Sequence, residues 1–259
     1  MTGLDWLVAL LEKRNVPIQH IGTGCVRMTL PVPHADGQTI TYTINVTGHG
    51  NSLMAAEDES NHLLPRFCPD RHIEGDGAFC MYWKEEQRFE VADEETALRW
   101  LEILLSFLRS QRRAANLGHW PTSDWSHGDA AARAQKRAEQ AAAVLSEEWR
   151  EMVIRRRMNV ERDRSGVYRV SLDDTFLYST WLVPKRRHGR LSQAVRVCEA
   201  TPKTRRIVSK HGRALHLRAL AVALWAWNRT EEQFWNHVAA MPCCGTMKTC
   251  GLRKHLCMT

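Results

Sequence analysis

The chain has 259 residues, enough for one large domain or two modest ones. Hydrophobic residues make up 44% of it and charged residues 25%, as is typical of a soluble globular protein. The formal net charge is +7, and no apolar run approaches the roughly 20 residues of a membrane span, which argues against a membrane protein. The first residues lack the pattern of a signal peptide, so we expect a cytoplasmic protein whose eight cysteines are thiols or metal ligands.

The charge is unevenly distributed along the chain. Residues 1–120 hold 11 Lys and Arg against 16 Asp and Glu, a net charge of −5. Residues 121–259 hold 25 basic and 13 acidic residues, a net charge of +12. This shift in composition predicts a domain boundary near Trp120-Pro121.

The first 50 residues predict a short helix followed by antiparallel strands. Leucines recur from Leu4 to Leu11 with the spacing of one helix face. Residues 18–30 and 38–48 have the composition of strands, and the second segment alternates in β-rich residue types. The segment 33–37 between them carries Pro, Asp and Gly, which favours a hairpin turn.

Residues 64–80 form a proline-punctuated loop that carries a histidine and a cysteine. Gly75-Asp76-Gly77 can supply the positive φ angles of a sharp turn, so we expect the chain to fold back and bring His72 near Cys80. Cysteine attacks as its thiolate, and a nearby histidine favours that form. The pattern predicts a loop that presents Cys80 as a nucleophile.

A helix follows this loop, from Ala97 to Arg113. Leucines from Leu98 to Leu108 form an apolar stripe along it, which predicts that the helix packs on a core. Asp93 is placed to cap its N-terminus.

The second half of the chain predicts more helix than strand. Strong helix formers run from Asp129 to Met158, so we interpret this segment as one long helix. Residues 166–183 are expected to form two strands around Asp173-Asp174. Residues 214–227 have the broad apolar face of a buried helix, and Thr230 begins a pattern that indicates the cap of a further helix.

A strongly basic segment runs from Lys185 to Arg218, with 11 basic residues and one acidic residue, Glu199. Such a patch can bind nucleic-acid phosphates or an acidic protein surface, and it can also be a solvated face without a partner. It lacks interleaved aromatic residues for base stacking, so we expect at most weak nucleic-acid binding.

The C-terminal tail is rich in cysteine. Cys243, Cys244 and Cys250 fall within eight residues, and Gly245 and Gly251 follow two of them as in the turns that often hold zinc. The spacing is not a standard paired Cys-x-x-Cys signature, so structural zinc, reduced thiols and a redox-active group remain alternatives. The candidates for a fourth zinc ligand are Cys198, His255 and Cys257.

The loop carries a family resemblance. The run His72-Ile73-Glu74 followed by Gly77-Ala78-Phe79-Cys80 resembles the active-site segment of ubiquitin-conjugating (E2) enzymes, where a His-Pro-Asn motif precedes a Gly-x-Ile-Cys element. The entry Cys68-Pro69-Asp70-Arg71-His72-Ile73 and the ending Gly-x-Phe-Cys resemble those of bacterial E2-like proteins. The apolar helix and Trp120-Pro121 continue the resemblance, which covers about the first half of the chain. Glu74 stands where the family has Asn.

The resemblance implies an α+β fold of the ubiquitin-conjugating (UBC-like) type, with an antiparallel sheet and flanking helices, followed by a mostly helical C-terminal region. The expected domains are an E2-like domain at 1–121, a linker and connecting helix at 122–160, and a basic C-terminal domain with the cysteine-rich tail at 161–259.

The resemblance further implies an acyl-transfer enzyme. Cys80 would accept a ubiquitin-like modifier from an E1-like activating enzyme as a thioester and pass it to an amine, with no cofactor for this step. His72 would shape the loop, and Asp76 would orient the amine or make the turn. A JAB-type peptidase is a further expected partner, in a bacterial pathway that is sometimes linked to antiphage defence.

Two other functions fit the same residues. In one, Cys68, His72 and Cys80 bind zinc together with a tail cysteine, and the protein is a zinc-stabilised module that binds nucleic acid or protein. In the other, the chain is an inactive E2-fold adaptor.

Overall fold

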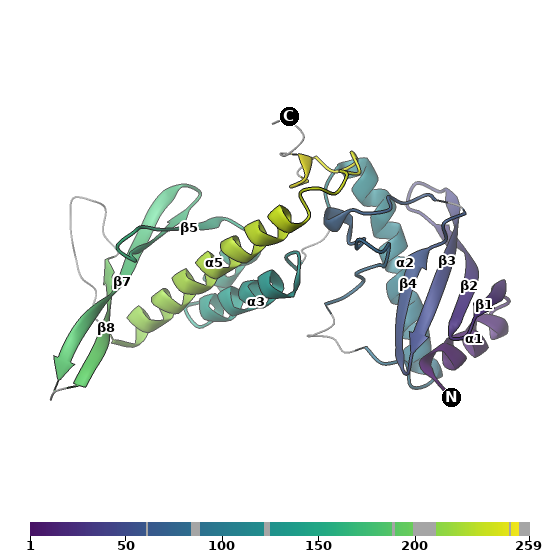
Figure 1. Cartoon of the computed structure of the whole chain (residues 1–259), viewed down its shortest axis with the longest axis horizontal. Coiled ribbons are helices and arrows are strands. Elements are labelled where there is room, and N and C mark those ends of the chain that lie inside the picture. The colour runs from purple at the N-terminus through teal and green to yellow at the C-terminus, as the bar shows by residue number, and fades with distance from the viewer. Residues whose placement is uncertain are drawn as a thin grey trace. The chain divides into compact units, whose positions relative to one another are not determined.

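The computed structural model describes residues 1–60, 62–83, 89–121, 125–187, 190–198, 211–248 and 250–253; for 183–187, 190–196, 198 and 211 it describes the backbone alone. The chain forms two compact units. The first contains Met1–Thr122 together with Val238–Thr259, and the second contains Ser123–His237. Each unit has its own sheet and helices (Figure 1). Among the described residues, no helix is both long enough and apolar enough to cross a membrane.

The sheet of the first unit is antiparallel, and its four strands are hydrogen-bonded in chain order. Alternate residues of the two central strands are buried, such as Met28 and Ile44, because successive side chains of a strand point to opposite faces. The strands are β1 (Ile18–Gly22), β2 (Cys25–Pro33), β3 (Thr39–His49) and β4 (Ser52–Glu57).

Two helices pack against this sheet, α1 (Gly3–Lys13) and α2 (Glu94–Leu117). Leu7 and Leu11 of α1 are fully buried in the same core as Leu104 of α2, as the spacing of the leucines predicts. The order of helix, antiparallel strands, cysteine loop and helix agrees with the order expected from the sequence.

The second unit also contains an antiparallel four-stranded sheet in chain order. Asp173 and Asp174 both have positive φ angles, 46° and 64°, and form the two-residue turn between its second and third strands. The predicted strands around this pair are therefore confirmed. The strands of the sheet are β5 (Met158–Arg162), β6 (Tyr168–Leu172), β7 (Thr175–Arg187) and β8 (Arg190–Cys198).

Three helices complete the second unit: α3 (Asp129–Ala143), α4 (Glu147–Ile154) and α5 (His211–His237). Helix α5 lies along α3 and also contacts all four strands (Figure 1). The Tyr178 hydroxyl of β7 donates a hydrogen bond of 2.8 Å to the Leu217 carbonyl oxygen of α5, which satisfies a buried polar group at this contact. The small side chains of α3, such as Ala134 and Ala138, are buried in the same core.

The helices of this unit differ from those predicted. The segment 129–158 forms two helices and the start of a strand, because Ser146 accepts from the Trp149 N–H and begins a new helix. Thr230 caps no helix; its hydroxyl donates to the Ala226 carbonyl oxygen at 2.8 Å, and α5 continues through it.

The boundaries of the units also differ from the expected domains. The expected linker and connecting helix at 122–160 contain α3 and α4, which pack in the core of the second unit. The region expected to be mostly helical has a sheet as well. The tail from Val238 onward, expected with the C-terminal domain, belongs to the first unit, because its buried residues pack there.

Candidate active site

The loop before Cys80 is held by paired backbone hydrogen bonds. The N–H groups of Cys68 and Ile73 each donate to the other residue's carbonyl oxygen, both at 3.1 Å. Between them lies a single 3-10 turn, η1 (Pro69–Arg71), which ends at His72 in the left-handed region, with φ 55°. This conformation is uncommon for a residue other than glycine, so the flanking hydrogen bonds hold it.

A tight turn follows, as predicted. The Glu74 N–H donates to the Ala78 carbonyl oxygen at 2.9 Å, and the Gly77 N–H donates to that of Glu74 at 3.0 Å. Gly77 has φ 81°, which glycine adopts without strain. The Asp76 carboxylate accepts from the Ala78 N–H at 3.0 Å, so its observed contact is one that shapes the turn.

The end of the loop is fixed to the sheet and the core. The Phe79 N–H donates to the Ala55 carbonyl oxygen of β4 at 2.8 Å. The Phe79 ring lies 4.9 Å from the ring of Phe107 in α2. The Trp120 ring lies 5.9 Å from that of Phe107 and 4.7 Å from the imidazole of His72. One aromatic cluster therefore supports both arms of the loop.

Cys80 follows this anchor directly. Its N–H donates to the carbonyl oxygen of His72 at 2.8 Å, so the predicted proximity of the two residues is observed at the level of the backbone. The Cys80 side chain is half-buried, while Glu74 and Asp76 in the turn are exposed. The arrangement holds a free thiol at the end of a fixed loop, beside a histidine.

The cysteine-rich tail packs against the start of this loop, at η1, and against the end of α2. Arg71 is only 4% exposed; it donates from Nε to Gln111 Oε1 at 2.8 Å and from Nη1 to Thr246 Oγ1 at 3.3 Å. The Lys248 N–H donates to the carbonyl oxygen of Gly118, at the end of α2, at 2.7 Å. These contacts place the tail next to η1 and α2, within the first unit.

Four thiols meet where the tail reaches the loop. The sulfur atoms of Cys68 and Cys244 are 3.0 Å apart. The thiols of Cys243 and Cys250 hydrogen-bond to each other, and the charge of Cys250 raises the pKa of Cys68. We call these two thiol pairs, one of which includes Cys68 of the loop before Cys80, the thiol cluster.

The thiols of the cluster differ in acidity. The hydrogen bond with Cys68 lowers the pKa of Cys244 to about 5 despite its partial burial, and the hydrogen bonds with Thr246 and the charge of Arg71 act in the same direction. The same hydrogen bond, followed by burial, raises the pKa of Cys68. Burial is also the largest cause that raises the pKa of Cys250. Cys244 is thus the more acidic thiol of the pair that it forms with Cys68.

The residues predicted as metal ligands lie in different parts of the chain. Cys243, Cys244 and Cys250 are all described, and within the described residues no three His, Cys, Asp or Glu side chains have the arrangement of a metal centre. Cys198 ends β8 in the second unit. His255 and Cys257 lie outside the described residues.

The alternative set of Cys68, His72 and Cys80 is not supported by the observed contacts. Cys68 pairs with Cys244, and the ring of His72 packs on Trp120. Sequence reasoning missed the contacts of Arg71 and Gln111, although one signal was available: Gln111 continues the apolar stripe of α2 at helical spacing, and a polar residue on such a face needs a buried partner.

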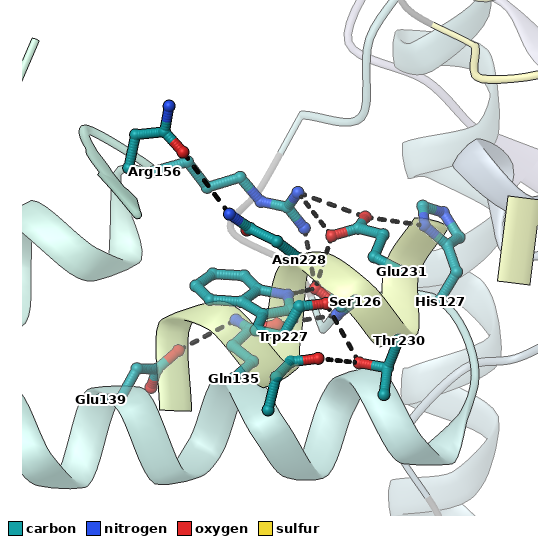
Figure 2. Close-up of polar contacts among 11 residues, drawn as sticks. Ser126, His127, Gln135, Glu139, Arg156, Trp227, Asn228, Thr230 and Glu231 are labelled. Atoms are coloured by element: carbon teal, nitrogen blue, oxygen red, sulfur yellow. Dashed lines mark hydrogen bonds and ion pairs between the residues drawn. The ribbon is translucent and has the colours of Figure 1, made fainter. Parts of the chain in front are cut away.

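A polar network in the second unit was also not predicted. Figure 2 shows Glu231 between His127 and Arg156; its carboxylate is 3.4 Å from His127 Nδ1 and 3.0 Å from Arg156 Nη1. Burial raises the pKa of Glu231, but these two partners together lower it below its usual value. Ser126 Oγ accepts from Arg156 at 2.8 Å and also contacts the indole nitrogen of Trp227. The network connects the start of the unit to α5, which is a structural role.

Comparison with known families divides the chain near residue 122, but it keeps the tail with the C-terminal part. Residues 15–122 match the prokaryotic E2 domain, and residues 126–252 match the cysteine-rich domain that occurs C-terminal to the E2 domain. No curated protein and no solved structure matches the chain. The loop of His72 and Cys80 lies in the first match, and the tail cysteines lie at the end of the second. The chain therefore belongs to the family of prokaryotic E2 domains followed by a C-terminal cysteine-rich domain.

Proposed function

We propose that the protein is an E2-like conjugating enzyme in which Cys80 carries a ubiquitin-like modifier as a thioester. One observation carries this proposal: in a prokaryotic E2 domain, a half-buried free thiol stands at the end of a loop that is fixed on both arms. In the same proposal, the first unit has the ubiquitin-conjugating fold.

The reaction consists of two acyl transfers. The Cys80 thiolate attacks the thioester that joins the modifier to the E1 cysteine, a new carbon–sulfur bond forms, and the E1 thiolate leaves. An amine of the target then attacks the Cys80 thioester, the Cys80 thiolate leaves, and the nitrogen loses a proton to give an amide. Both steps depend on holding the reacting groups in place and on stabilising the oxyanion.

The loop residues have supporting roles in this proposal. A carboxylate only accepts hydrogen bonds, so Glu74 cannot replace the family's Asn as a donor to the oxyanion, and we assign that role to backbone N–H groups. His72 shapes the loop through its left-handed backbone and its packing on Trp120. Asp76 shapes the turn.

The partners follow from the same proposal. An E1-like activating enzyme supplies the modifier, a ubiquitin-like protein is the modifier itself, and a JAB-type peptidase acts in the same pathway. The resemblance to bacterial E2-like proteins supports these partners and a place in a bacterial conjugation pathway, including antiphage defence.

We also propose that the tail binds a structural zinc ion through Cys243, Cys244 and Cys250. Thiolate sulfur is a preferred zinc ligand, and structural zinc takes four ligands. The gathering of these three thiols at the thiol cluster supports this proposal.

The test of the conjugating function is adduct formation. The protein is mixed with its cognate E1, the modifier and ATP, and run on gels with and without reductant. We expect a reductant-sensitive adduct that is absent in Cys80→Ala and present in Cys25→Ala, a half-buried thiol of β2. Cys80→Ser should give a more stable oxyester wherever the serine reacts. A reductant-sensitive adduct that persists in Cys80→Ala would contradict the assignment.

A further inference from the structure

The C-terminal tail contacts the loop that leads to Cys80 at both of its turns. At η1, the Arg71 guanidinium donates from Nη1 to Thr246 Oγ1 at 3.3 Å. At the glycine turn, a Cβ atom on Gly75 would lie 4.0 Å from Met241 Cε, an ordinary van der Waals distance, so the Met241 side chain lies beside this turn. The tail and the loop therefore meet over more than a single contact, although they are far apart in the sequence.

The tail is itself anchored in the first unit. The Lys248 N–H donates to the carbonyl oxygen of Gly118, at the end of α2, at 2.7 Å. Three further tail residues are each at most 2% exposed, namely Met247, Cys250 and Leu252. Thr246 directly precedes this anchored segment, so its hydroxyl is held at a fixed place relative to α2.

We propose that the tail positions the active-site loop, with Thr246 acting on Cys80 through Arg71. Both Thr246 and Arg71 are then positioning residues, because they act through other groups. The effect on the reaction rests on the proposed thioester chemistry, whereas the effect on the loop does not. The match to the prokaryotic E2 domain ends at residue 122, so the proposal has this domain completed by a segment that lies outside it.

Arg71 connects the tail to the backbone beside Cys80. The Arg71 carbonyl oxygen accepts from Gln111 Nε2 at 2.5 Å, and the guanidinium donates to the Gln111 side chain and main chain at 2.8 and 3.1 Å. The next residue, His72, accepts the Cys80 N–H at its carbonyl oxygen at 2.8 Å. A shift of the Arg71 backbone therefore moves the acceptor that holds Cys80.

The tail supplies an acceptor to a buried cation. Arg71 is 4% exposed, so a guanidinium N–H that loses Thr246 bears the cost of an unsatisfied charged donor and moves toward another acceptor or water. The rate of acyl transfer is sensitive to such a movement, because a misplacement of about 1 Å can slow a reaction by about 100-fold. The contact with Thr246 thus has a larger expected effect on the rate than on the stability.

The experiment compares full-length variants in the transfer of the modifier from the E1 thioester to Cys80, with rates normalised to the fraction of Cys80 that loads at completion. Thr246→Val removes the acceptor of Arg71, and we expect it to lower kcat by about tenfold with little change in the KM for the E1 conjugate. Thr246→Ser keeps a hydroxyl and should transfer at close to the wild-type rate. Thr41→Val, at an exposed position of β3, is the matched control and should leave transfer unchanged.

Two further measurements isolate this contact. In Arg71→Met, the additional change Thr246→Val should slow transfer no further, because both substitutions remove the same hydrogen bond. Hydrogen exchange of the protein alone needs no partner, and the Cys80 N–H reports how firmly the loop is held because it donates to His72. Thr246→Val should speed exchange at Cys80 by at least about threefold, whereas Thr246→Ser and Thr41→Val should leave it unchanged.

The outcomes separate the positioning role from the proposed function. Wild-type rates of transfer and of exchange in Thr246→Val would overturn the positioning role and leave Cys80 as the nucleophile. Slower transfer that Thr246→Ser fails to restore would also overturn it, because the hydroxyl would then not be the group that acts. A wild-type protein that forms no adduct on Cys80 would contradict the conjugating function, and hydrogen exchange alone would then decide whether the tail holds the loop.

Discussion

At the scale of single residues, Arg71 carries its charge into the interior of the first unit. Burial lowers the pKa of its guanidinium, and the group is held by hydrogen bonds to the Gln111 side chain and main chain. The Gln111 amide in turn donates to the Arg71 carbonyl oxygen at 2.5 Å. This exchange fixes η1 against α2, three residues before the turn that begins at Glu74.

We predict that Gln111→Ala lowers the free energy of unfolding of the first unit by about 2–3 kcal/mol, because it leaves a buried guanidinium N–H and a buried carbonyl oxygen without their partners. Urea denaturation of the full chain measures the change, and hydrogen exchange of α2 assigns it to this unit. Arg113→Ala, an exposed change two residues away in the same helix, should alter the stability by less than about 0.5 kcal/mol. Equal effects of the two variants would contradict the role of the pair.

At the scale of elements, α2 supports the loop that precedes Cys80. Its Phe107 packs on Phe79 of the loop, and its Gln111 accepts a hydrogen bond from Arg71. Its start is fixed by a capping box in which Asp93 Oδ1 accepts from the Thr96 N–H at 2.8 Å and Thr96 Oγ1 accepts from the Asp93 N–H at 3.0 Å. The predicted cap at Asp93 is therefore confirmed.

Asp93→Ala should destabilise the first unit by about 1 kcal/mol, because the first turn of the helix loses its side-chain acceptor. Thermal unfolding followed by circular dichroism gives the shift. Asp93→Asn keeps an acceptor at this position and should stay close to the wild type. If Asp93→Asn destabilised the first unit as much as Asp93→Ala does, the charge of Asp93 would matter more than its role as a hydrogen-bond acceptor.

At the scale of the whole molecule, the function of the basic segment Lys185–Arg218 is a proposal. Its backbone runs along β7 and β8 and into α5, and several of its residues lie outside the described ones. Arg218, at its end, lies 5.4 Å from the centre of the Tyr168 ring and packs within the second unit. We propose that the rest of the segment docks a protein partner of the conjugation reaction.

Charge reversal tests this proposal. Arg186→Glu, Arg187→Glu, Arg205→Glu and Arg206→Glu together should slow thioester transfer from E1 by about tenfold at physiological salt, because opposite charges speed association. Arg137→Glu, Arg155→Glu, Arg164→Glu and Arg229→Glu together, exposed changes elsewhere in the second unit, alter the net charge by the same amount and control for it. Unchanged transfer with a loss of tight DNA or RNA binding would favour a nucleic-acid site instead.

The sequence by itself determined the local features of this protein. Periodicity located both helices of the first unit, and strand composition located the segments of β1 to β3 but not β4, since one face of each element must be buried. The glycines of 75–77 and the acidic pair at 173–174 located two turns, because few residue types adopt a positive φ. The proximity of His72 and Cys80 followed from one of these turns, a contact local in sequence.

The tertiary structure alone decided the contacts between distant segments. Composition changes near Trp120, yet the tail from Val238 packs in the first unit, because a pairing such as Cys68 with Cys244 has no local signature. The continuity of α5 through Thr230 depends on its packing along α3, whereas the break between α3 and α4 has a local cause in the Ser146 cap. The buried partner of Arg71 is chosen by the fold, since many polar residues of the sequence could accept its hydrogen bond and the fold places Gln111 Oε1 2.8 Å from its Nε.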